Sequence, residues 1–468
     1  MRTTFLTRAV RFLAGAGLGI LAACAGNDTV APAPNQAREA VPAATRAVPG
    51  RYVVLMKRGQ EQAVTAAAAV VGPKAVRTFT DIGVATMKDL TSAEVASLQA
   101  AGGVEAVVPD LDVEWIPGAP ELFHQAALQA PQGPRAQGTD QSGAAFFAFQ
   151  WNMGVIHAQT AWNATPGGAG ELVCILDTGI DPDHLDLAGK VDLNRSTSVI
   201  SAPLFPGDLE VTDYNSHGSF VAGLVSSNGI GMASVAPDAQ LCAVKVLKVD
   251  GFGSFGDIIS GIDFAVHHGA DVINMSLSGY VDRTAPGAET LIRALQAAVD
   301  FANAHSVLVV ASAGNAGINL DEDPVQFLNI PNQLNNVMSV GATAPFNQQN
   351  FDMLASYSNY GGRTGLDMVA PGGDLLAGGN TLDLVLSVCS QYQITLPFPC
   401  GSADYLFGAG TSFSSPEVAG AAAVVESQLG GPQGSGIIAN CLLNTADNVG
   451  PRRIFGAGRL NIGNAAGC

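Results

Sequence analysis

Leu172-Val173-Cys174-Ile175-Leu176-Asp177-Thr178-Gly179 is an apolar run of strand length that ends in a carboxylate and a glycine turn. From Phe146 onward, apolar strands of this kind alternate with helical segments, which is typical of a parallel sheet covered by helices. The other strands expected are 239–247, 272–275, 307–311 and 337–340, and the clearest helices are 258–268 and 291–305. Residues 146–468 are therefore predicted to form an α/β fold, a mostly parallel sheet with helices on both faces.

Polar side chains stand at the ends of these strands and at the starts of the helices. Asp177 ends the first strand, Asn315 follows the strand 307–311, and His217 opens a helix of small residues. Gly410-Thr411-Ser412 opens an apolar helix, with a proline near its start, where a missing N–H costs nothing. Taken singly, each residue also fits an ordinary role as a turn former, a left-handed loop residue or a helix cap.

Together, the four groups match the needs of one reaction. Acyl transfer requires a serine, an imidazole that takes and returns its proton, a carboxylate that orients the imidazole, and donors for the oxyanion. In open α/β sheets, ligands bind beyond the carboxyl ends of the strands, where such turns meet. Four unrelated turns would rarely present complementary groups by accident. The sequence therefore favours catalysis, with Ser412 as the nucleophile.

The chain resembles the subtilisin-like serine proteases from about Trp151 to Gly463. The motifs that carry the resemblance occur in the family order: Asp177-Thr178-Gly179, His217-Gly218-Ser219, Val272-Ile273-Asn274-Met275-Ser276-Leu277, Ala313-Gly314-Asn315 and Gly410-Thr411-Ser412. The chain order Asp, His, Ser is that of subtilisin. The resemblance implies that Asp177, His217 and Ser412 form the catalytic triad. It also implies that Asn315 is the side-chain oxyanion donor beside the Ser412 backbone N–H.

The same resemblance assigns a substrate cleft. The segment expected to pair with an extended peptide comprises Gly251, Phe252, Gly253, Ser254 and Phe255, and the wall of the main specificity pocket comprises Ser276, Leu277 and Ser278. Main-chain pairing gives affinity irrespective of side chain, so extended polypeptides are the expected substrates. An ordinary glycine loop remains the alternative for 251–255.

Four residues depart from the family pattern, and a fifth concerns calcium. Ser278 replaces the common glycine in the pocket wall and could narrow the pocket. Phe220 stands where the family usually has a second histidine, and Phe413 where many relatives carry methionine. Glu417 replaces a frequent histidine, and a carboxylate so near the nucleophile could change the pH profile. Asp186 aligns with a calcium ligand of the family, but the loop 226–231, which would supply further oxygen ligands, is short. No cofactor is expected for the chemistry, and a structural calcium ion at Asp186 is left open.

Residues 51–116 predict a separate small module. Strands at 52–56, 76–79, 83–87 and 104–108 and helices at 62–71 and 92–101 give the order βαββαβ of a ferredoxin-like α+β fold. Thr91-Ser92-Ala93-Glu94 fits a capping box at the start of the second helix. The module resembles the family propeptide, which acts as folding chaperone and temporary inhibitor. The irregular linker 117–145 is expected to be exposed and cut, somewhere between 116 and 150.

The N-terminus predicts export. Arginines at positions 2, 8 and 11 precede an apolar run over 12–23 that is too short to span a bilayer comfortably. Leu21-Ala22-Ala23-Cys24 resembles the bacterial lipobox, which implies a lipoprotein-type signal over 1–23 and a lipid anchor on Cys24. The alternative is an ordinary secretory signal. Residues 24–50, rich in alanine and proline, are expected to form a tether.

Charge and cysteine content narrow the partners and the compartment. Only 13% of the residues are charged and the net charge is −18, which argues against a nucleic-acid partner, because phosphate-binding surfaces need clustered Lys and Arg. Apart from Cys24, six cysteines remain in a chain that is expected to reach an oxidising compartment. Disulfides are predicted for Cys389 with Cys400 and for Cys441 with Cys468. Cys174 and Cys242 are expected to stay free, buried thiols.

The sequence as a whole predicts a self-processing, exported serine endopeptidase that meets the membrane only through a lipid. The precursor would be anchored at the outer surface or in the periplasm, and the mature enzyme could be released. Its partners would be extended polypeptides and its own propeptide. Two alternatives remain: a catalytically silent surface protein that binds peptides, and an esterase with the same machinery.

Overall fold

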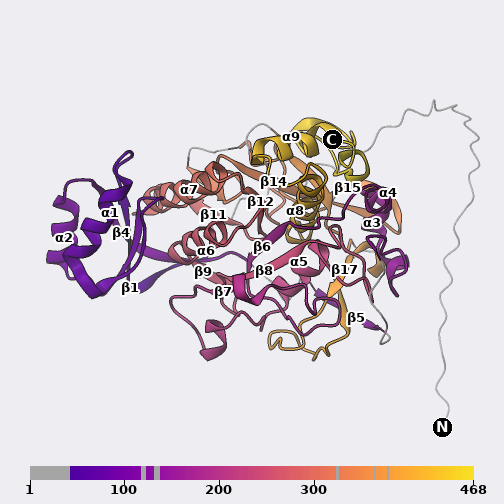
Figure 1. Ribbon diagram of the computed structural model, residues 1–468, viewed down its shortest axis with the longest axis horizontal. Helices are drawn as coiled ribbons and strands as arrows, with labels where there is room; N and C mark the ends of the chain where they lie inside the picture. The colour runs from indigo at the N-terminus through magenta and orange to yellow at the C-terminus, as the bar shows by residue number, and fades with distance from the viewer. Residues whose placement is uncertain (1–42, 117–122, 131–137, 323–325, 363–364, 377–378) are drawn as a thin grey trace, which may run out of the picture.

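The centre of the protein is an eight-stranded sheet, which the computed structural model places in the order β15-β14-β12-β10-β6-β8-β7, with β16 also paired to β14 (Figure 1). The structure describes residues 43–116, 123–130, 138–322, 326–362, 365–376 and 379–468. Neighbouring strands run parallel, except that β15 is antiparallel to β14. The predicted mostly parallel sheet is thereby confirmed.

The strands of this sheet follow the apolar runs of the sequence. Their bounds are β6 (Leu172–Asp177), β7 (Thr197–Ser198), β8 (Gln240–Lys245), β10 (Val272–Met275), β12 (Leu308–Ser312), β14 (Val337–Phe346), β15 (Gln349–Leu354) and β16 (Met368–Pro371). The main helices are α5 (His217–Val225), α6 (Phe255–His267), α7 (Ala288–Ala304), α8 (Thr411–Gln428) and α9 (Ser435–Thr445). Shorter helices are α3 (Trp151–Val155), α4 (Ala158–Ala164), α10 (Arg452–Phe455) and α11 (Ile462–Ala465).

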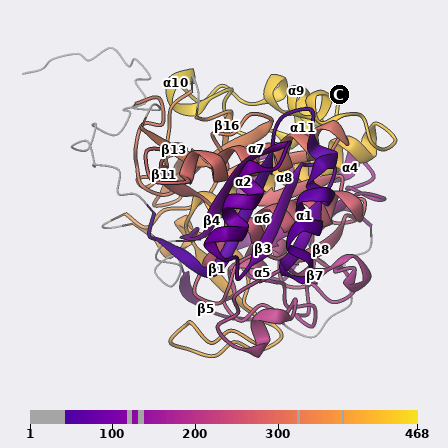
Figure 2. The same cartoon turned by 90° about the vertical axis from the view of Figure 1, so that its left-hand side faces the viewer.

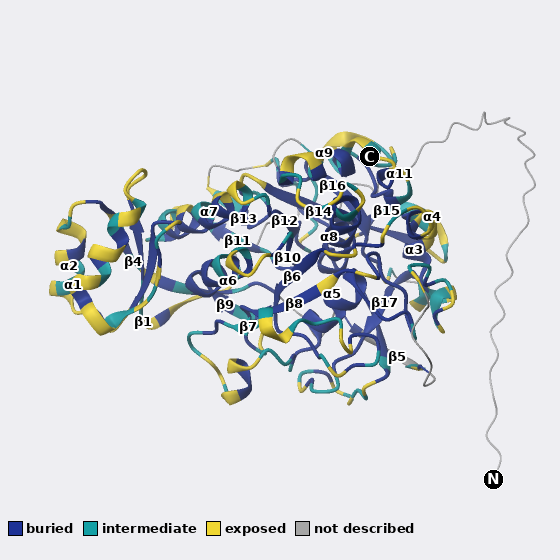
Figure 3. Cartoon of the chain, in the orientation of Figure 1, coloured by how far each residue is buried: buried dark blue, intermediate teal, exposed yellow. Residues whose placement is uncertain are grey.

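Helices cover both faces of the sheet. Along β6, Val173 and Ile175 belong to the apolar cluster that includes α5 and α8, whereas Cys174 and Leu176 belong to the cluster that includes α6 and α7. This alternation follows from the two-residue period of a strand. Because both faces are covered, the central strands β6, β10 and β12 are buried along their length, whereas the edge strands β7 and β15 are partly exposed. Figure 3 shows the burial of each element.

The N-terminal module lies at one end of the molecule, with its helices on the outer face (Figure 2). It consists of β1 (Thr45–Met56), α1 (Val64–Val71), β2 (Ala75–Phe79), β3 (Val84–Lys88), α2 (Ser92–Ala100) and β4 (Val104–Glu114). The predicted capping box is present, because Thr91 and Glu94 exchange side-chain and backbone hydrogen bonds. β1 begins at Thr45, so the last residues of the predicted tether belong to a strand.

The two parts of the chain share a sheet. The module's strands have the order β2-β3-β1-β4, and β9 (Phe252–Ser254) adds to β4 as a fifth strand. The pairing is antiparallel, with Val113 opposite Gly253 and Glu114 opposite Phe252. On β1, Val53 and Leu55 pack toward the α6–α7 cluster, while Val54 and Met56 pack under the module's own helices. The module is thus bound both by a sheet edge and by an apolar face.

A second, smaller sheet corrects the prediction for the linker. β17 (Val385–Val388) and β18 (Asp404–Gly408) pair antiparallel, and β5 (Phe123–Gln129) adds to β18. Residues 117–145 were expected to be irregular and exposed, but Phe123 is buried and β5 is a strand. β5 forms because β18, far along the chain, offers it a free edge. A separate antiparallel pair of strands, β11 (Gly279–Asp282) and β13 (Phe327–Ile330), follows β10 in the chain, with α7 and β12 between the two strands.

Three disulfides cross-link the described residues. Cys389–Cys400 and Cys441–Cys468 form as predicted. The prediction that Cys174 and Cys242 stay free is wrong, because a third disulfide joins them. The two residues lie directly opposite one another on β6 and β8, with Cα atoms 4.5 Å apart. Adjacent strands bring the two thiols together, which their positions in the sequence could not reveal.

Cys24 and the predicted signal lie outside the described residues. Among the helices that the structure describes, none is long and apolar enough to cross a membrane.

Candidate functional site

Asp177 is the last residue of β6 and lies at the start of α5, where its carboxylate contacts His217. Nδ1 of His217 lies 2.8 Å and 3.0 Å from the two carboxylate oxygens of Asp177, and both side chains are fully buried. The Asp177 carboxylate also accepts a hydrogen bond from Thr178 N. Because a carboxylate accepts only, His217 carries its proton on Nδ1, which leaves Nε2 free to take another.

The turn that leads into α5 is fixed by Asp213, a residue that the sequence did not single out. Its buried carboxylate accepts hydrogen bonds from Asn215 N, Ser216 N and Ser219 N. These bonds hold Ser216 in the left-handed region, at a φ of 91°, directly before His217. Asp213 therefore fixes the backbone before His217 and, with it, the direction in which the His217 side chain points.

Ser412 is the second residue of α8 and is 5% exposed. Its Oγ donates to the carbonyl of Ser276 at 3.2 Å, and its own carbonyl accepts from Ser276 Oγ at 2.7 Å. Among the described residues, Nε2 of His217 has no hydrogen-bond partner. A rotation of the Ser412 hydroxyl away from Ser276 is therefore needed before serine and histidine can exchange a proton, and uncomplexed sites often show such loose geometry.

Asn315 follows β12 and faces the same turn. Its Oδ1 accepts from Thr411 N at 2.9 Å and from Thr411 Oγ1 at 2.7 Å. These two bonds fix which end of the amide is oxygen, so the NH₂ group points to the other side. A Cβ added at Gly410 would lie 3.5 Å from Asn315 Nδ2, which places that donor beside the Gly410–Ser412 turn. The amide NH₂ group is thus placed to donate to an oxyanion that develops beside the turn that carries Ser412.

The predicted cleft segments lie on either side of the module's last residues. Trp115 N donates to the Gly251 carbonyl at 3.2 Å, and Trp115 Nε1 donates to the Gly253 carbonyl at 2.9 Å. On the other side, Ser278 N donates to the Trp115 carbonyl at 3.1 Å. The indole is 1% exposed and meets the Phe255 ring edge-on, with centroids 5.6 Å apart. The segment 251–255 is therefore a pairing edge rather than a free glycine loop.

The two aromatic departures from the family pattern lie side by side. Phe220 on α5 and Phe413 on α8 have ring centroids 4.2 Å apart, and both are fully buried. Phe123 of β5 packs on both rings, at 5.4 Å and 5.8 Å. It also meets the imidazole of His217 edge-on, at 6.5 Å. The sequence did not single out Phe123 or Trp115 as site residues. In the sequence they are recognisable only as aromatic residues on either side of a short proline-containing linker.

Glu417 does not act as the charged neighbour that the sequence suggested. Its side chain is fully buried on α8, and burial raises its pKa well above the ordinary value. Asn152 Nδ2 donates to Glu417 Oε1 at 2.7 Å, while Glu417 Oε2 and Asn152 Oδ1 have no hydrogen-bond partner in the part of the chain that the structure describes. A proton on Oε2 would satisfy both remaining atoms as an acid–amide pair. Glu417 therefore links α8 to α3 through Asn152, and its burial favours the neutral acid.

The surroundings of Asp186 do not fit a calcium ion. Its carboxylate accepts hydrogen bonds from Ile230 N at 2.7 Å, Gly231 N at 2.9 Å and Met232 N at 3.0 Å. Tyr405 Oη donates to it as well, at 2.7 Å. Calcium needs oxygen ligands, whereas the backbone groups that face this carboxylate are N–H donors. Asp186 therefore holds the loop 230–232 through hydrogen bonds, and this arrangement does not provide a calcium site.

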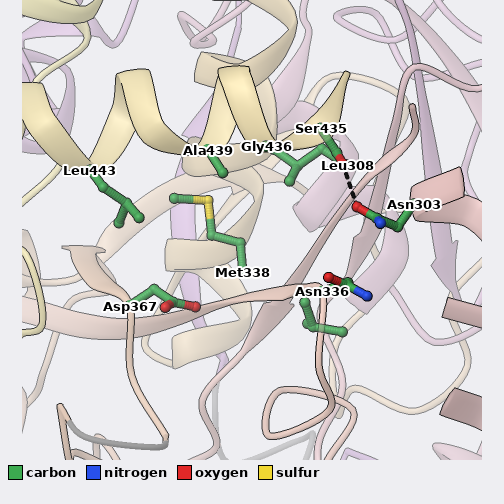
Figure 4. Close-up of a pocket in the computed structure, with 10 residues that line it drawn as sticks. Asn303, Leu308, Asn336, Met338, Asp367, Ser435, Gly436, Ala439 and Leu443 are labelled. Carbon is green, nitrogen blue, oxygen red and sulfur yellow. Dashed lines mark hydrogen bonds between the residues drawn. The ribbon is translucent and has the colours of Figure 1, made fainter. Parts of the chain in front are cut away.

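A cavity of about 170 Å³ lies away from this constellation (Figure 4). Its lining includes Leu308 and Val337, at the starts of β12 and β14, whereas Asp177 and Asn315 stand at or beyond strand ends. In parallel strands, starts and ends lie at opposite edges of the sheet. The cavity is therefore separate from the predicted catalytic groups.

Comparisons with known proteins agree with the geometry. Residues 168–458 match the model of the subtilase family, Peptidase S8. The thermophilic serine proteinase of Bacillus sp. (strain AK1) is 32% identical over 372 residues, which cover 78% of this chain and 76% of that protein. Subtilisin BL of Lederbergia lenta is 35% identical over 314 residues, which cover 66% of this chain and 96% of that protein.

Solved structures show the same fold. The epidermin leader peptide processing serine protease of Staphylococcus aureus superposes with a TM-score of 0.70 at 21% identity, and the match covers 89% of this chain and 97% of that one. A lanthipeptide protease superposes with a TM-score of 0.58 at 28% identity, over 72% of this chain and 99% of that one. The chain therefore belongs to the subtilase family and is a serine-type endopeptidase with a subtilisin-like fold.

Proposed function

We propose that the chain is a self-processing zymogen in which Ser412, His217 and Asp177 hydrolyse peptide bonds through an acyl-enzyme. The observation that carries the catalytic assignment is the hydrogen bond from His217 Nδ1 to Asp177, with Nε2 left free near the helix that bears Ser412. Nε2 takes the Ser412 proton as Oγ attacks the substrate carbonyl carbon, and then gives it to the leaving amine. Water repeats the sequence on the ester to release the acid.

Asn315 and the Ser412 backbone N–H donate to the oxyanion in each half of the reaction. The support for Asn315 is its fixed amide: both bonds from Thr411 go to Oδ1, so its NH₂ group is oriented before substrate arrives. Such preorganised donors stabilise the transition state without a cost of reorientation at the moment of reaction.

Residues 51–116 act as the propeptide and inhibit the enzyme until the linker is cut. The proposal is supported by β4, which pairs with β9, and by Trp115, which lies between the two segments of the cleft. An extended substrate would need the same backbone groups of Gly251, Gly253 and Ser278. A polypeptide substrate and the module therefore exclude one another.

Export and anchoring follow from the N-terminal sequence alone. Cys24, within its lipobox-like stretch, is proposed as the lipidated residue, and the membrane is reached only through that lipid. Cleavage in the linker would leave the lipid on the propeptide and free the enzyme. Mass spectrometry of both N-termini tests this, because lipidation adds a diacylglyceryl group to Cys24 and cleavage creates a new N-terminus after residue 116.

A serine-directed phosphonate tests the catalytic assignment. The processed protein is expected to be labelled, and Ser412→Ala is expected to lose the label. Ser427→Ala is the matched control, because Ser427 lies on the same helix and its Oγ donates to the Ala169 carbonyl at 2.8 Å. A protein that is folded and processed by an added protease, yet is never labelled, would instead be a silent peptide-binding protein. Turnover of esters without turnover of peptides would identify an esterase.

A further inference from the structure

A loop closed by a disulfide, residues 389–400, lies against the turn that precedes α5. This disulfide loop follows β17 in the chain and precedes β18, and the bond between Cys389 and Cys400 joins its two ends. β17 lies beside α5 (Figure 1), and Ser387 Oγ on β17 donates to the Phe220 carbonyl on α5 at 2.7 Å. This contact brings the loop to the helix that bears the proposed catalytic histidine.

Each residue of the turn 213–216 accepts a hydrogen bond from the disulfide loop. The four bonds run from Ser390 Oγ to the Asp213 carbonyl (2.6 Å), from Ser390 N to Ser216 Oγ (3.0 Å), from Ile394 N to the Tyr214 carbonyl (2.9 Å) and from Thr395 Oγ1 to the Asn215 carbonyl (3.0 Å). Three of the four acceptors are backbone carbonyls. The loop therefore holds the main chain of the turn as well as one of its side chains.

The loop supplies the bonds that Asp213 cannot make. The Asp213 carboxylate accepts from the N–H groups of Asn215 and Ser216, whereas the loop donates to the carbonyl groups of the turn. Both kinds of group need partners, because Asn215 and Ser216 are 3% and 0% exposed. Ser216 also has a φ of 91°, which a residue with a side chain keeps only when its surroundings determine it. Donors and acceptors together fix the backbone that enters α5.

We propose that Ser390 is a positioning residue for His217, and that the disulfide loop holds the imidazole where Nε2 can take the Ser412 proton. The inference rests on the proposed function, because it assumes that this proton transfer occurs. Among the described residues, hydrogen bonds reach the imidazole only at Nδ1, from Asp177. The direction of Nε2 therefore depends on the backbone that carries the ring. A displacement of a reacting group by about 1 Å can cost about a hundredfold in rate.

Substitutions of Ser390 test the proposal in the full chain after processing by an added protease. Ser390→Ala removes the bond to the Asp213 carbonyl, and Ser390→Thr keeps a hydroxyl there. For a peptide p-nitroanilide, Ser390→Ala is expected to lower kcat about tenfold and to leave KM within about twofold of the wild type, because a displaced base slows the chemistry without changing the contacts that bind substrate. Ser390→Thr is expected to recover most of kcat. A lower melting temperature with an unchanged kcat would show a purely structural loop and would overturn the proposal.

Two further positions in the loop provide a control and a reserve. Tyr392→Phe is the matched control, because the Tyr392 hydroxyl donates to Asp183 Oδ2 at 2.5 Å and not to the turn. Its kcat is expected to match the wild type, and an equal loss in Tyr392→Phe and Ser390→Ala would overturn the role given to Ser390. If Ser390→Ala does not fold, Thr395→Val decides in its place. It removes the bond to Asn215 from a partly exposed position, and an unchanged kcat there would contradict the proposal.

Phosphonate labelling separates this inference from the proposed function. A wild type that is never labelled sinks the proposed function, whereas equal labelling rates of the wild type and Ser390→Ala sink only the positioning role. In the unlabelled case, the proton on His217 Nδ1 still reports on the loop, because its hydrogen bond to a carboxylate shifts its NMR signal downfield and slows its exchange. The signal is expected in the wild type and in Ser390→Thr and is expected to broaden or disappear in Ser390→Ala. An unchanged signal in Ser390→Ala would overturn the proposal.

Discussion

Replacing Asp110 by asparagine is predicted to make the N-terminal module, our proposed propeptide, dissociate slowly from the enzyme at neutral pH. Asp110, on β4, is fully buried against the start of α6, where its Oδ1 accepts a hydrogen bond from Gly256 N at 3.2 Å. Its Oδ2 has no hydrogen-bond partner among the described residues. Asp257, also buried, accepts a hydrogen bond from Ser201 Oγ at 3.0 Å. Burial first, and the charge of Asp257 second, raise the pKa of Asp110 to about 7.

The sign and size of the effect follow from this shift. A propeptide that has left the enzyme exposes Asp110, whose pKa then returns toward 3.8, so the bound state favours the protonated acid. Binding is strongest below pH 4 and weakens as the pH rises from about 4 to about 7. Three pKa units correspond to about 4 kcal/mol, or up to roughly a thousandfold in affinity above pH 7, as an upper bound for an interface that can relax.

The assay measures the rate at which the enzyme dissociates from the proposed propeptide after the linker has been cut. After processing, the complex is diluted at pH 5, 7 and 9, and the return of p-nitroanilide hydrolysis gives the dissociation rate. The wild type is expected to dissociate at least tenfold faster at pH 9 than at pH 5, whereas Asp110→Asn stays slow throughout. Asp89→Asn, an exposed carboxylate of the same module, is the control. Parallel pH profiles for Asp110→Asn and the wild type would refute the reasoning.

Three further predictions concern single contacts. Trp115→Ala is expected to weaken propeptide inhibition at least thirtyfold, or about 2 kcal/mol, in a titration with substrate, because a buried tryptophan anchors such interfaces; unchanged inhibition would contradict its place in the cleft. Loss of the Cys389–Cys400 disulfide, by serine at both positions, is expected to cost about 3 kcal/mol in denaturant unfolding, and an unchanged midpoint would argue against it. Glu417→Gln is expected to leave the pH–activity profile unchanged. Burial raises the pKa of Glu417, so the wild type, unlike the variant, loses stability as the pH rises above the ordinary pKa of glutamate. At pH 9 the variant should therefore have a higher melting temperature than the wild type. A lower melting temperature of the variant would disprove the neutral pair.

The features that the sequence predicted well are local. The buried strand before Asp177 and the amide after β12 were recognisable because an apolar run that ends in a polar turn fits a parallel sheet. The capping box at Thr91 needs only its own four residues. In each case the side chain that decides the structure and the backbone that it organises are neighbours in the chain.

The features that it missed depend on partners far along the chain. β5 has an Ala- and Gln-rich sequence with little strand preference, and it is a strand because β18 offers an edge. Cys174 and Cys242 became partners only when β6 and β8 paired. The pKa of Glu417 is raised by burial, and its hydrogen bond from Asn152, on a different helix, exists only in the folded chain. The composition of the sequence and the spacing of its motifs do not predict contacts of this kind.

The bonds of Asp186 bear on where this enzyme can work. A metal that braces a loop is shared with the surroundings, so any chelator, acidic polymer or calcium-poor water competes for it. Here the group that holds Ile230, Gly231 and Met232 is the Asp186 carboxylate of the same chain. Its effective concentration at the loop does not depend on the composition of the medium. The order of this loop is thus set by the chain itself and does not depend on the ions in the medium.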